Sequence, residues 1–185
     1  MLFILVTGMP GAGKSIVTRV AVEMGLPVYN MGDVVREEVL KRYGHVTPEL
    51  MISTSRELRK EYGEDVIAVR TLEKIKQKAK AVVIDGVRSL TEVEAFRKHG
   101  DVVIIAVHAS PRTRFERLLA RKRPGDPNTY EEFLKRDLVE LGFGIGNVIA
   151  LADHMLVNES IIEDIEKQAK ELLDRLVKMR AQGDR

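Results

Sequence analysis

Five short runs of apolar residues recur along the chain, and each has the length of a buried β-strand. The first run ends at Gly8 and the third is closed by Asp85 and Gly86, residue types that commonly end strands in turns. The predicted strands are residues 2–7, 27–30, 81–84, 102–107 and 154–157.

Between these runs, apolar residues fall at the three- and four-residue spacing of helices that bury one face. Pro111 stands at a favourable first position for one of them. Helices are predicted at residues 14–24, 89–99 and 129–141, and a longer helical stretch covers residues 33–79 with breaks near 44–48 and at 63. Another helix begins at residue 111 and is expected to bury Phe115, Leu118 and Leu119. The last helix has its apolar residues on one stripe, namely Ile161, Ile165, Leu172 and Leu176.

Apolar strands that alternate with helices predict an α/β protein with a five-stranded parallel sheet and helices on both faces. The helical stretch between the second and third strands is longer than an ordinary crossover, so residues 32–79 are expected to form a mobile helical insertion. We expect a single domain over residues 1–185 that carries this insertion.

Composition narrows the possible classes of protein. The chain has 185 residues and no cysteine, which excludes disulfides, Cys-ligated zinc and a Cys nucleophile. Its apolar runs are far shorter than the roughly 20 residues of a membrane span, and the first lacks the basic region of a signal peptide. The net charge of +2 gives no reason to expect nucleic acid as a partner. A cytoplasmic protein without a membrane partner is expected.

A phosphate-binding motif follows the first predicted strand. The glycines of G-x-x-x-x-G-K-[ST] let the backbone wrap around phosphates, and the next helix directs its positive dipole end at them. In such a motif the lysine reaches the β- and γ-phosphates and the hydroxyl can ligate Mg²⁺. The alternative, a glycine-rich turn with a surface lysine, fits the flanking strand and helix less well. The matching residues are Gly8, Met9, Pro10, Gly11, Ala12, Gly13, Lys14 and Ser15.

Asp85 is the candidate second ligand of a metal ion, beside Ser15. It ends a predicted parallel strand, and the carboxyl ends of such strands face the ligand side of the sheet. A carboxylate there can hold Mg²⁺, often through water. The alternative is a turn-forming Asp-Gly pair, which the nearby phosphate motif makes less attractive.

These motifs together resemble those of the nucleoside monophosphate kinases, the group of adenylate kinases and dephospho-CoA kinases. The phosphate motif is close to the adenylate kinase form, residues 32–36 (GDVVR) resemble the acceptor-phosphate motif G-D-x-x-R, and residues 85–88 (DGVR) resemble D-G-x-P-R. Residues 152–158 are similar to the last strand of dephospho-CoA kinases. The chain is most similar to a group of archaeal adenylate-kinase-like proteins.

The resemblance implies a three-layer P-loop fold, ATP and Mg²⁺ as cofactors, a small phosphorylated acceptor and a short lid at about residues 121–130. The implied catalytic residues are Lys14, Arg88, Arg121 and Arg123, and the implied acceptor-binding residues are Asp33, Arg36, Arg88 and Arg136. Asn158 falls where relatives have residues near the donor base. Asp33 could take a proton from a hydroxyl acceptor, or could simply cap its helix. Met31 replaces a usual threonine and the proline of D-G-x-P-R is missing, so specificity for adenylate is not implied.

Basic residues gather at positions 112–123. Phosphoryl transfer needs several cations, because negative charge spreads over the oxygens of the transferring group. We expect this role for Arg121 and Arg123, while Arg112, Arg114 and Lys122 are expected to be solvated. Among the arginines on the insertion, one is a candidate for a substrate contact and most are expected to be solvated; they are Arg56, Arg59 and Arg70. An RNA backbone contact is the alternative for the cluster, although few aromatic residues are available to stack on bases.

The favoured activity is therefore that of a small ATP-dependent kinase acting on a nucleotide or nucleotide-like acceptor. Its rival is an ATP-binding switch or weak ATPase that acts with a protein or RNA partner, in which ATP orders the lid and insertion. A separate feature is the alternation of Gly142, Gly144 and Gly146, which indicates a close backbone approach or a flexible turn.

Overall fold

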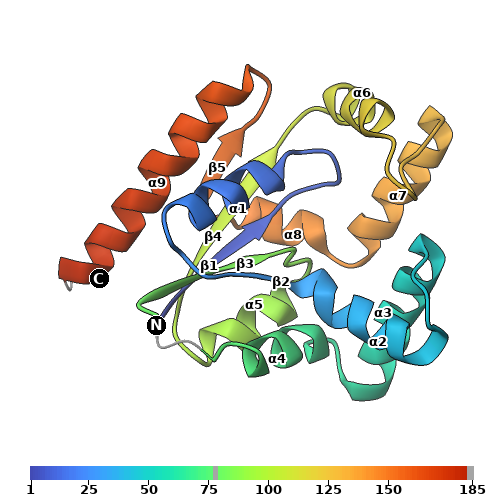
Figure 1. The fold of residues 1–185 in the computed structure, drawn as a ribbon, viewed down its shortest axis with the longest axis horizontal. Helices are drawn as coiled ribbons and strands as arrows, with labels where there is room; N and C mark the ends of the chain where they lie inside the picture. The colour runs from blue at the N-terminus through green and yellow to red at the C-terminus, as the bar shows by residue number, and fades with distance from the viewer. Residues whose placement is uncertain (77–78, 183–185) are drawn as a thin grey trace.

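The computed structural model describes residues 1–76 and 79–182. Its centre is a sheet in which every neighbouring pair of strands is parallel (Figure 1). The strands are β1 (Leu2–Thr7), β2 (Val28–Asn30), β3 (Ala81–Asp85), β4 (Asp101–His108) and β5 (His154–Val157), in the order β2-β3-β1-β4-β5. The five predicted strands are confirmed with ends shifted by a residue at most.

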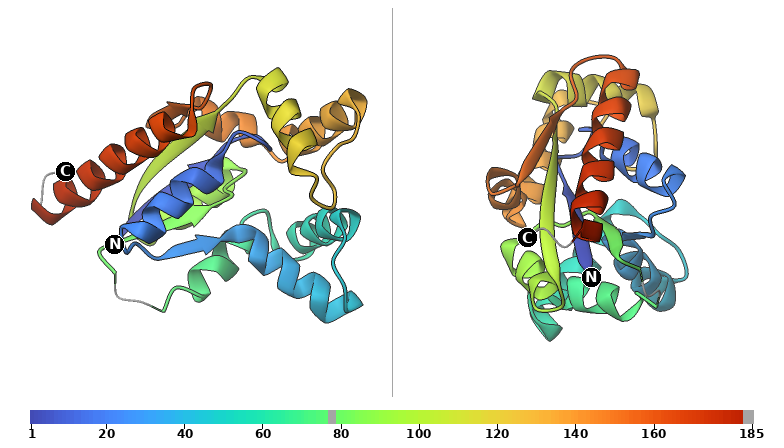
Figure 2. Two further views of the ribbon diagram at one scale, coloured as in Figure 1. Left: turned by 45° about the horizontal axis from the view of Figure 1, so that its top comes forward. Right: turned by 90° about the vertical axis from the view of Figure 1, so that its left-hand side faces the viewer.

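Two apolar cores lie on the two faces of the sheet. Figure 2 shows the helices that cover these faces as layers on both sides of the strands. Successive side chains of a strand point to opposite faces, so Phe3 and Leu5 of β1 enter one core while Ile4 and Val6 enter the other. Helices α1 (Lys14–Glu23) and α9 (Ile162–Gln182) cover the second core. Helices α5 (Leu90–Arg97) and α8 (Ile145–Ala150) cover the first, and the three-layer α/β fold is confirmed.

The predicted insertion consists of helices α2 (Met31–Tyr43), α3 (Pro48–Tyr62) and α4 (Val66–Glu73). The breaks fall where expected: Gly44 ends α2 with a left-handed φ of 73°, and Gly63 ends α3. Thr47 then caps α3, whose first residue is Pro48. Residues 77–78, near the end of the predicted insertion, lie outside the described residues. Its exact boundaries, and those of the domain, stay a prediction.

Two further helices, α6 (Pro111–Arg121) and α7 (Tyr130–Gly142), flank the predicted lid. Ser110 caps α6 and Thr129 caps α7, each by accepting a hydrogen bond from a backbone N–H in the first turn. Figure 1 shows this pair and the pair α2 and α3 extending past the carboxyl ends of the strands. The carboxyl edge of the sheet is therefore flanked by two helical pairs, α2 with α3 and α6 with α7.

The turn predicted for the glycine-rich segment is present at residues 143–144, but a short helix that was not predicted follows it. Gly142 still belongs to α7, Gly144 caps the next helix with a left-handed φ of 96°, and Gly146 lies inside α8. The reason is tertiary packing, because Ile145 and Val148 of this short helix are buried against the sheet. The sequence pattern is too short to reveal a helix of six residues.

The last helix confirms its predicted stripe only in part. Ile165, Leu172 and Leu176 are buried, but Ile161 precedes α9 and is 63% exposed. None of the helices that the structure describes is long and apolar enough to cross a membrane.

Candidate active site

The phosphate motif forms a loop between β1 and α1, as its sequence predicts. A side chain at Gly8 would meet the carbonyl oxygen of Val107 on the neighbouring strand, and φ at Gly8 is 146°. A side chain at Gly13 would meet the buried amide of Asn158, and φ there is 100°. Glycine is therefore required at both positions. Gly13 offers α1 no side-chain cap, which leaves the first N–H groups of the helix free for an anion.

Lys14 is the first residue of α1, and its Nζ donates to the carbonyl oxygen of Gly8 at the start of the loop, at 2.6 Å. Burial lowers the pKa of Lys14, and the nearby carboxylate of Asp85 acts in the opposite direction. A phosphate group would add negative charge next to the ammonium and so restore the preference for its charged form.

A polar cavity of about 150 Å³ opens beside the loop. Four cationic side chains line it, each from a different element: the loop, the turn after β3, the end of α6 and the middle of α7. They are Lys14, Arg88, Arg121 and Arg136. Such an arrangement suits a ligand with several charged oxygens.

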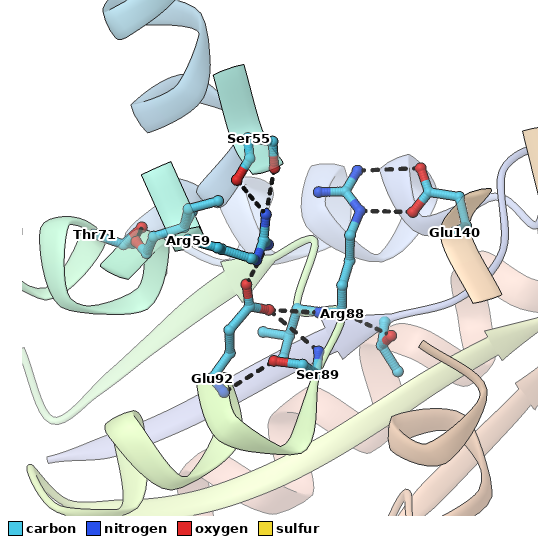
Figure 3. A network of polar contacts seen from close by, with 10 residues as sticks. Ser55, Arg59, Thr71, Arg88, Ser89, Glu92 and Glu140 are labelled. Carbon is cyan, nitrogen blue, oxygen red and sulfur yellow. Dashed lines mark hydrogen bonds and ion pairs between the residues drawn. The ribbon is translucent and has the colours of Figure 1, made fainter. Parts of the chain in front are cut away.

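Among the described residues that line this cavity, one is acidic, and it is Glu140. Its Oε2 accepts from Nε of Arg88 at 2.6 Å, and Figure 3 shows the two side chains facing each other. Burial alone would raise the pKa of Glu140, but the charge and the hydrogen bond of Arg88 outweigh it, so the pKa is lowered. Sequence reasoning missed Glu140. The available signal was its position four residues after Arg136 on one helix, which puts both on one face.

Asp85 ends β3 next to β1, with Val6 as its partner in the register. Its Oδ2 accepts from the side chain of Asn30 at 3.2 Å, while Oδ1 is buried and meets no hydrogen-bond partner in the described part of the chain. Burial raises the pKa of Asp85, and the charges of Lys14 and Arg88 oppose this shift. Asn30 was not identified from the sequence.

These groups fit a magnesium ion. An orphaned carboxylate oxygen is a natural ligand for a hard cation, and the exposed hydroxyl of Ser15 stands in the first turn of α1. No cluster of three or more His, Asp or Glu side chains suited to a metal occurs in residues 1–76 and 79–182. Mg²⁺ would thus be held by Ser15 and Asp85 together with phosphate oxygens and water, as is usual for this ion.

Three of the predicted catalytic and acceptor-binding residues, Asp33, Arg36 and Arg123, are not among those that line the cavity, and neither are the predicted metal ligands Ser15 and Asp85. The side chains of Asp33 and Arg36 lie on α2, 59% and 55% exposed, with Nε of Arg36 at 3.7 Å from Oδ1 of Asp33. Arg123 is also exposed, and its backbone N–H donates to Asp126 at 2.9 Å. Their predicted roles would need the insertion and the lid to approach the loop.

The prediction that Arg114 is solvated is wrong. Arg114 is 4% exposed and forms a double hydrogen bond with Asp137 of α7, at 2.8 and 2.6 Å. It also donates to the carbonyl oxygen of Pro10 at 3.2 Å, so it contacts the backbone of the phosphate loop directly. Helical spacing alone could not distinguish it from Arg112, whose side chain is 89% exposed as predicted. Lys122 is exposed as predicted too.

Asn158 also supports the loop. Its side chain is buried, donates to the carbonyl oxygen of Ala12 at 2.9 Å and accepts from Arg117 at 3.3 Å. The resemblance implied a position near the donor base, and the contact found in the structure is with the backbone of the loop. Arg117 was not singled out as a loop-supporting residue from the sequence.

Asp126 organises the predicted lid. Its carboxylate accepts from Arg121 at 2.9 and 2.5 Å, from the backbone N–H of Arg123 and from Arg136 at 3.1 Å. The hydrogen bond from Arg121 is the main cause that lowers the pKa of Asp126 from 3.8 to about 2. Arg121 and Arg136 are therefore held by a carboxylate at the rim of the cavity.

This lowered pKa predicts an acid-dependent loss of stability. A carboxyl whose pKa is lower in the folded state stabilises the fold above its ordinary pKa, and this contribution disappears as the pH falls through the folded value. We expect Asp126→Asn to lower the free energy of unfolding near neutral pH, and the gap from the wild type to close between roughly pH 4 and pH 2. Urea unfolding across this range measures the gap; a constant gap would contradict the assignment.

The fold and the site together define a P-loop protein of the kinase-like class. A family model described as an AAA domain matches residues 7–135. The UPF0200 protein of Staphylothermus marinus is 58% identical over 184 residues, which cover 100% of this chain and 97% of the relative. The chain therefore belongs to this AAA-domain family and, along its whole length, to the UPF0200 family.

Two solved structures share the fold. One is TT1252 from Thermus thermophilus, with a TM-score of 0.65, 22% identity and coverage of 95% of this chain and 97% of that chain. The other is shikimate kinase from Bacteroides thetaiotaomicron, with a TM-score of 0.60, 17% identity and coverage of 94% and 98%. At these identities the similarity establishes the architecture, in agreement with the resemblance to P-loop kinases found in the sequence.

Proposed function

We propose that the chain is a cytoplasmic ATP-dependent phosphotransferase that moves the γ-phosphoryl group of ATP to a small nucleotide or nucleotide-like acceptor. The observation that carries the proposal is the cavity beside the phosphate loop, where four cations from four separate elements converge. A loop that only binds ATP needs the lysine and the helix end. Additional arginines opposite the loop suit a transferring group and a second phosphate.

In this proposal the triphosphate of ATP lies along residues 8–15, with Mg²⁺ held by Ser15 and Asp85. When bound there, Mg²⁺ would supply positive charge against the phosphate oxygens. Lys14 and Arg121 stabilise the charge of the transferring group, and Arg123 joins them from the lid. Catalysis then consists mainly of positioning and charge stabilisation, with water excluded because it would compete as an acceptor.

The acceptor side of the site is assigned to Arg36, Arg88 and Arg136, with Asp33 nearby. Arg88 and Arg136 line the cavity, and Arg88 is held by Glu140 at 2.6 Å. A phosphate of the acceptor would replace this carboxylate as the partner of the guanidinium. Arg36 lies on α2 of the insertion, and it takes part once the insertion approaches the loop.

Arg36→Ala is expected to raise the KM for the acceptor by roughly 10-fold or more while the KM for ATP changes little, because a charge-assisted contact to one substrate is lost. Steady-state kinetics with each substrate varied in turn give the two values. Lys41→Ala serves as the control, because Lys41 is an exposed cation on the same helix that does not line the cavity. An equal rise of both KM values would refute an acceptor role for Arg36.

ADP release with ATP and Mg²⁺ tests the proposed function against a panel of acceptors. The panel contains AMP, CMP, UMP, GMP, dTMP, dephospho-CoA and shikimate, the last because a solved structure with this fold is a shikimate kinase. Lys14→Ala provides the blank. Strong stimulation by one compound supports a kinase and identifies its acceptor class. A slow rate that no acceptor changes would favour the ATP-binding switch or weak ATPase with a protein or RNA partner.

A further inference from the structure

A buried arginine of the insertion stands outside the site described so far. Arg59 lies on α3 and is 6% exposed, although sequence reasoning expected the insertion arginines to be mostly solvated. Its Nη2 donates to Oε1 of Glu92 at 2.7 Å, and its Nη1 donates to the hydroxyl and the carbonyl oxygen of Ser55. The side chains of Arg59 and Glu92 are 5% and 1% exposed, so the ion pair is removed from solvent.

Glu92 connects this arginine to the turn that carries Arg88. Its second oxygen, Oε2, accepts from the backbone N–H of Arg88 at 2.8 Å and from that of Ser89 at 3.3 Å. Ser89 accepts from the backbone N–H of Glu92 in return, which completes a capping box at the start of α5. Figure 3 shows the resulting chain of contacts from Ser55 through Arg59 and Glu92 to Arg88.

A third element also meets Arg59. Its guanidinium lies 4.8 Å from the ring centre of Phe143, which ends α7. The same helix carries Arg136 and Glu140, both on the cavity. Arg59 thus connects α3 of the insertion to the end of α7 and, through the carboxylate of Glu92, to the turn of Arg88.

Stability alone does not explain this ion pair. Burying two charges costs about as much free energy as their attraction returns, and apolar replacements of similar size are often as stable. The capping box itself needs Ser89 and Glu92 but not the arginine. What Arg59 adds is a fixed orientation of the carboxylate, because a guanidinium can hold Glu92 and Ser55 at the same time.

We infer that Arg59 is a positioning residue which, through Glu92, holds the backbone of Arg88 so that its side chain enters the cavity, and that it couples this turn to the insertion. The inference rests on the proposed function, in which Arg88 binds phosphate. A movement of α3 towards an acceptor would be passed to Arg88 through two contacts. The acceptor and the phosphate-binding arginine are thereby linked without Arg59 touching either substrate.

The test compares two changes at this pair. Arg59→Met/Glu92→Gln removes both charges together, so that no unpaired charge remains to unfold the protein. Arg59→Lys keeps the charge but cannot hold Glu92 and Ser55 at once. We expect the double variant to lower kcat by about 10- to 100-fold, since small misplacements cost this much. Its Kd for ATP should stay within about twofold of the wild type, and Arg59→Lys should lie between.

Arg42→Met is the matched control. Arg42 lies on α2 and pairs with Glu38 on the same helix at 2.6 Å and with Glu57 on α3 at 3.0 Å. It therefore joins two helices of the insertion, as Arg59 does not, and its ion pairs do not involve α5. Its kcat should match the wild type. If the double variant also has an unchanged kcat, or if its kcat and ATP affinity fall in parallel, the inference is wrong while the kinase stands.

Amide hydrogen exchange makes the inference independent of turnover. The backbone N–H groups of Arg88 and Ser89 should exchange roughly tenfold faster in Arg59→Lys, which leaves their acceptor Glu92 intact, with the amides of β1 unchanged. Equal exchange at Arg88 in both proteins would overturn the inference. If the wild type phosphorylates no acceptor, the proposed function fails, and exchange at these two amides still decides whether Arg59 holds the turn.

Discussion

Lys14→Ala is expected to reduce phosphoryl transfer by at least about 100-fold and to weaken ATP binding, because one positioned charge in a phosphate site has an effect of this size. Lys14 is the cation of the loop itself, lines the cavity and lies close enough to Asp85 for the two charges to influence each other. Its Nζ donates to the backbone of Gly8 at 2.6 Å, so the side chain is already directed along the loop. Alanine removes this charge with no other cation of the loop to replace it.

The control for this prediction is Arg112→Ala on α6. Arg112 belongs to the basic cluster, but its side chain is 89% exposed and pairs with Glu116 on the same helix. Its rate should equal that of the wild type. Single-turnover kinetics and ATP titration separate binding from transfer. Unchanged ATP turnover in Lys14→Ala would contradict the assignment of the site.

Arg114→Met is expected to lower the free energy of unfolding by about 3–5 kcal/mol, since it leaves the carboxylate of Asp137 without its buried partner. The two side chains are 5% and 12% exposed, and they join α6 to α7. The guanidinium also packs 4.8 Å from the ring centre of Phe133 and donates to Pro10 in the phosphate loop. The loop should therefore bind ATP less tightly even at temperatures where the variant is folded.

Two further variants show whether the lost charge pair causes this effect. Arg112→Met, two residues earlier on the same helix but exposed, should change the free energy of unfolding by no more than about 0.5 kcal/mol. Arg114→Met/Asp137→Leu removes both charges and should recover most of the stability. Denaturant unfolding measures all three. A loss in the double variant as large as in Arg114→Met would show that packing, rather than the unpaired carboxylate, dominates.

The fold could be predicted from the sequence because its strands are continuous apolar runs and its helices have caps and periodic apolar faces. Gly44, Thr47 and Gly63 divide the insertion at the predicted places, since each acts through local backbone geometry. Helix α8 could not be predicted. Only six residues long, it depends on burial of Ile145 and Val148 against strands distant in the sequence.

The residues of the site could be predicted where a local sequence motif specifies them. They could not be predicted where their burial depends on partners distant in the sequence. The loop of residues 8–15 and Asp85 follow from local sequence, whereas the burial of Arg59 and Arg114 depends on Glu92 and Asp137. These pairs are separated by 33 and 23 residues, and no spacing rule connects them. Charge patterning therefore predicts solvated arginines where the fold provides buried carboxylates.

The fate of the γ-phosphoryl group tests the central claim most directly. ATP labelled with ³²P at the γ position is incubated with Mg²⁺, the protein and the acceptor that stimulates ADP release most, and the products are separated by chromatography. The account predicts that nearly all label released from ATP is found on the acceptor, and that Lys14→Ala transfers none. Label found only in inorganic phosphate, at a rate that acceptors do not change, would contradict the account, because the site would then be that of an ATPase or a switch.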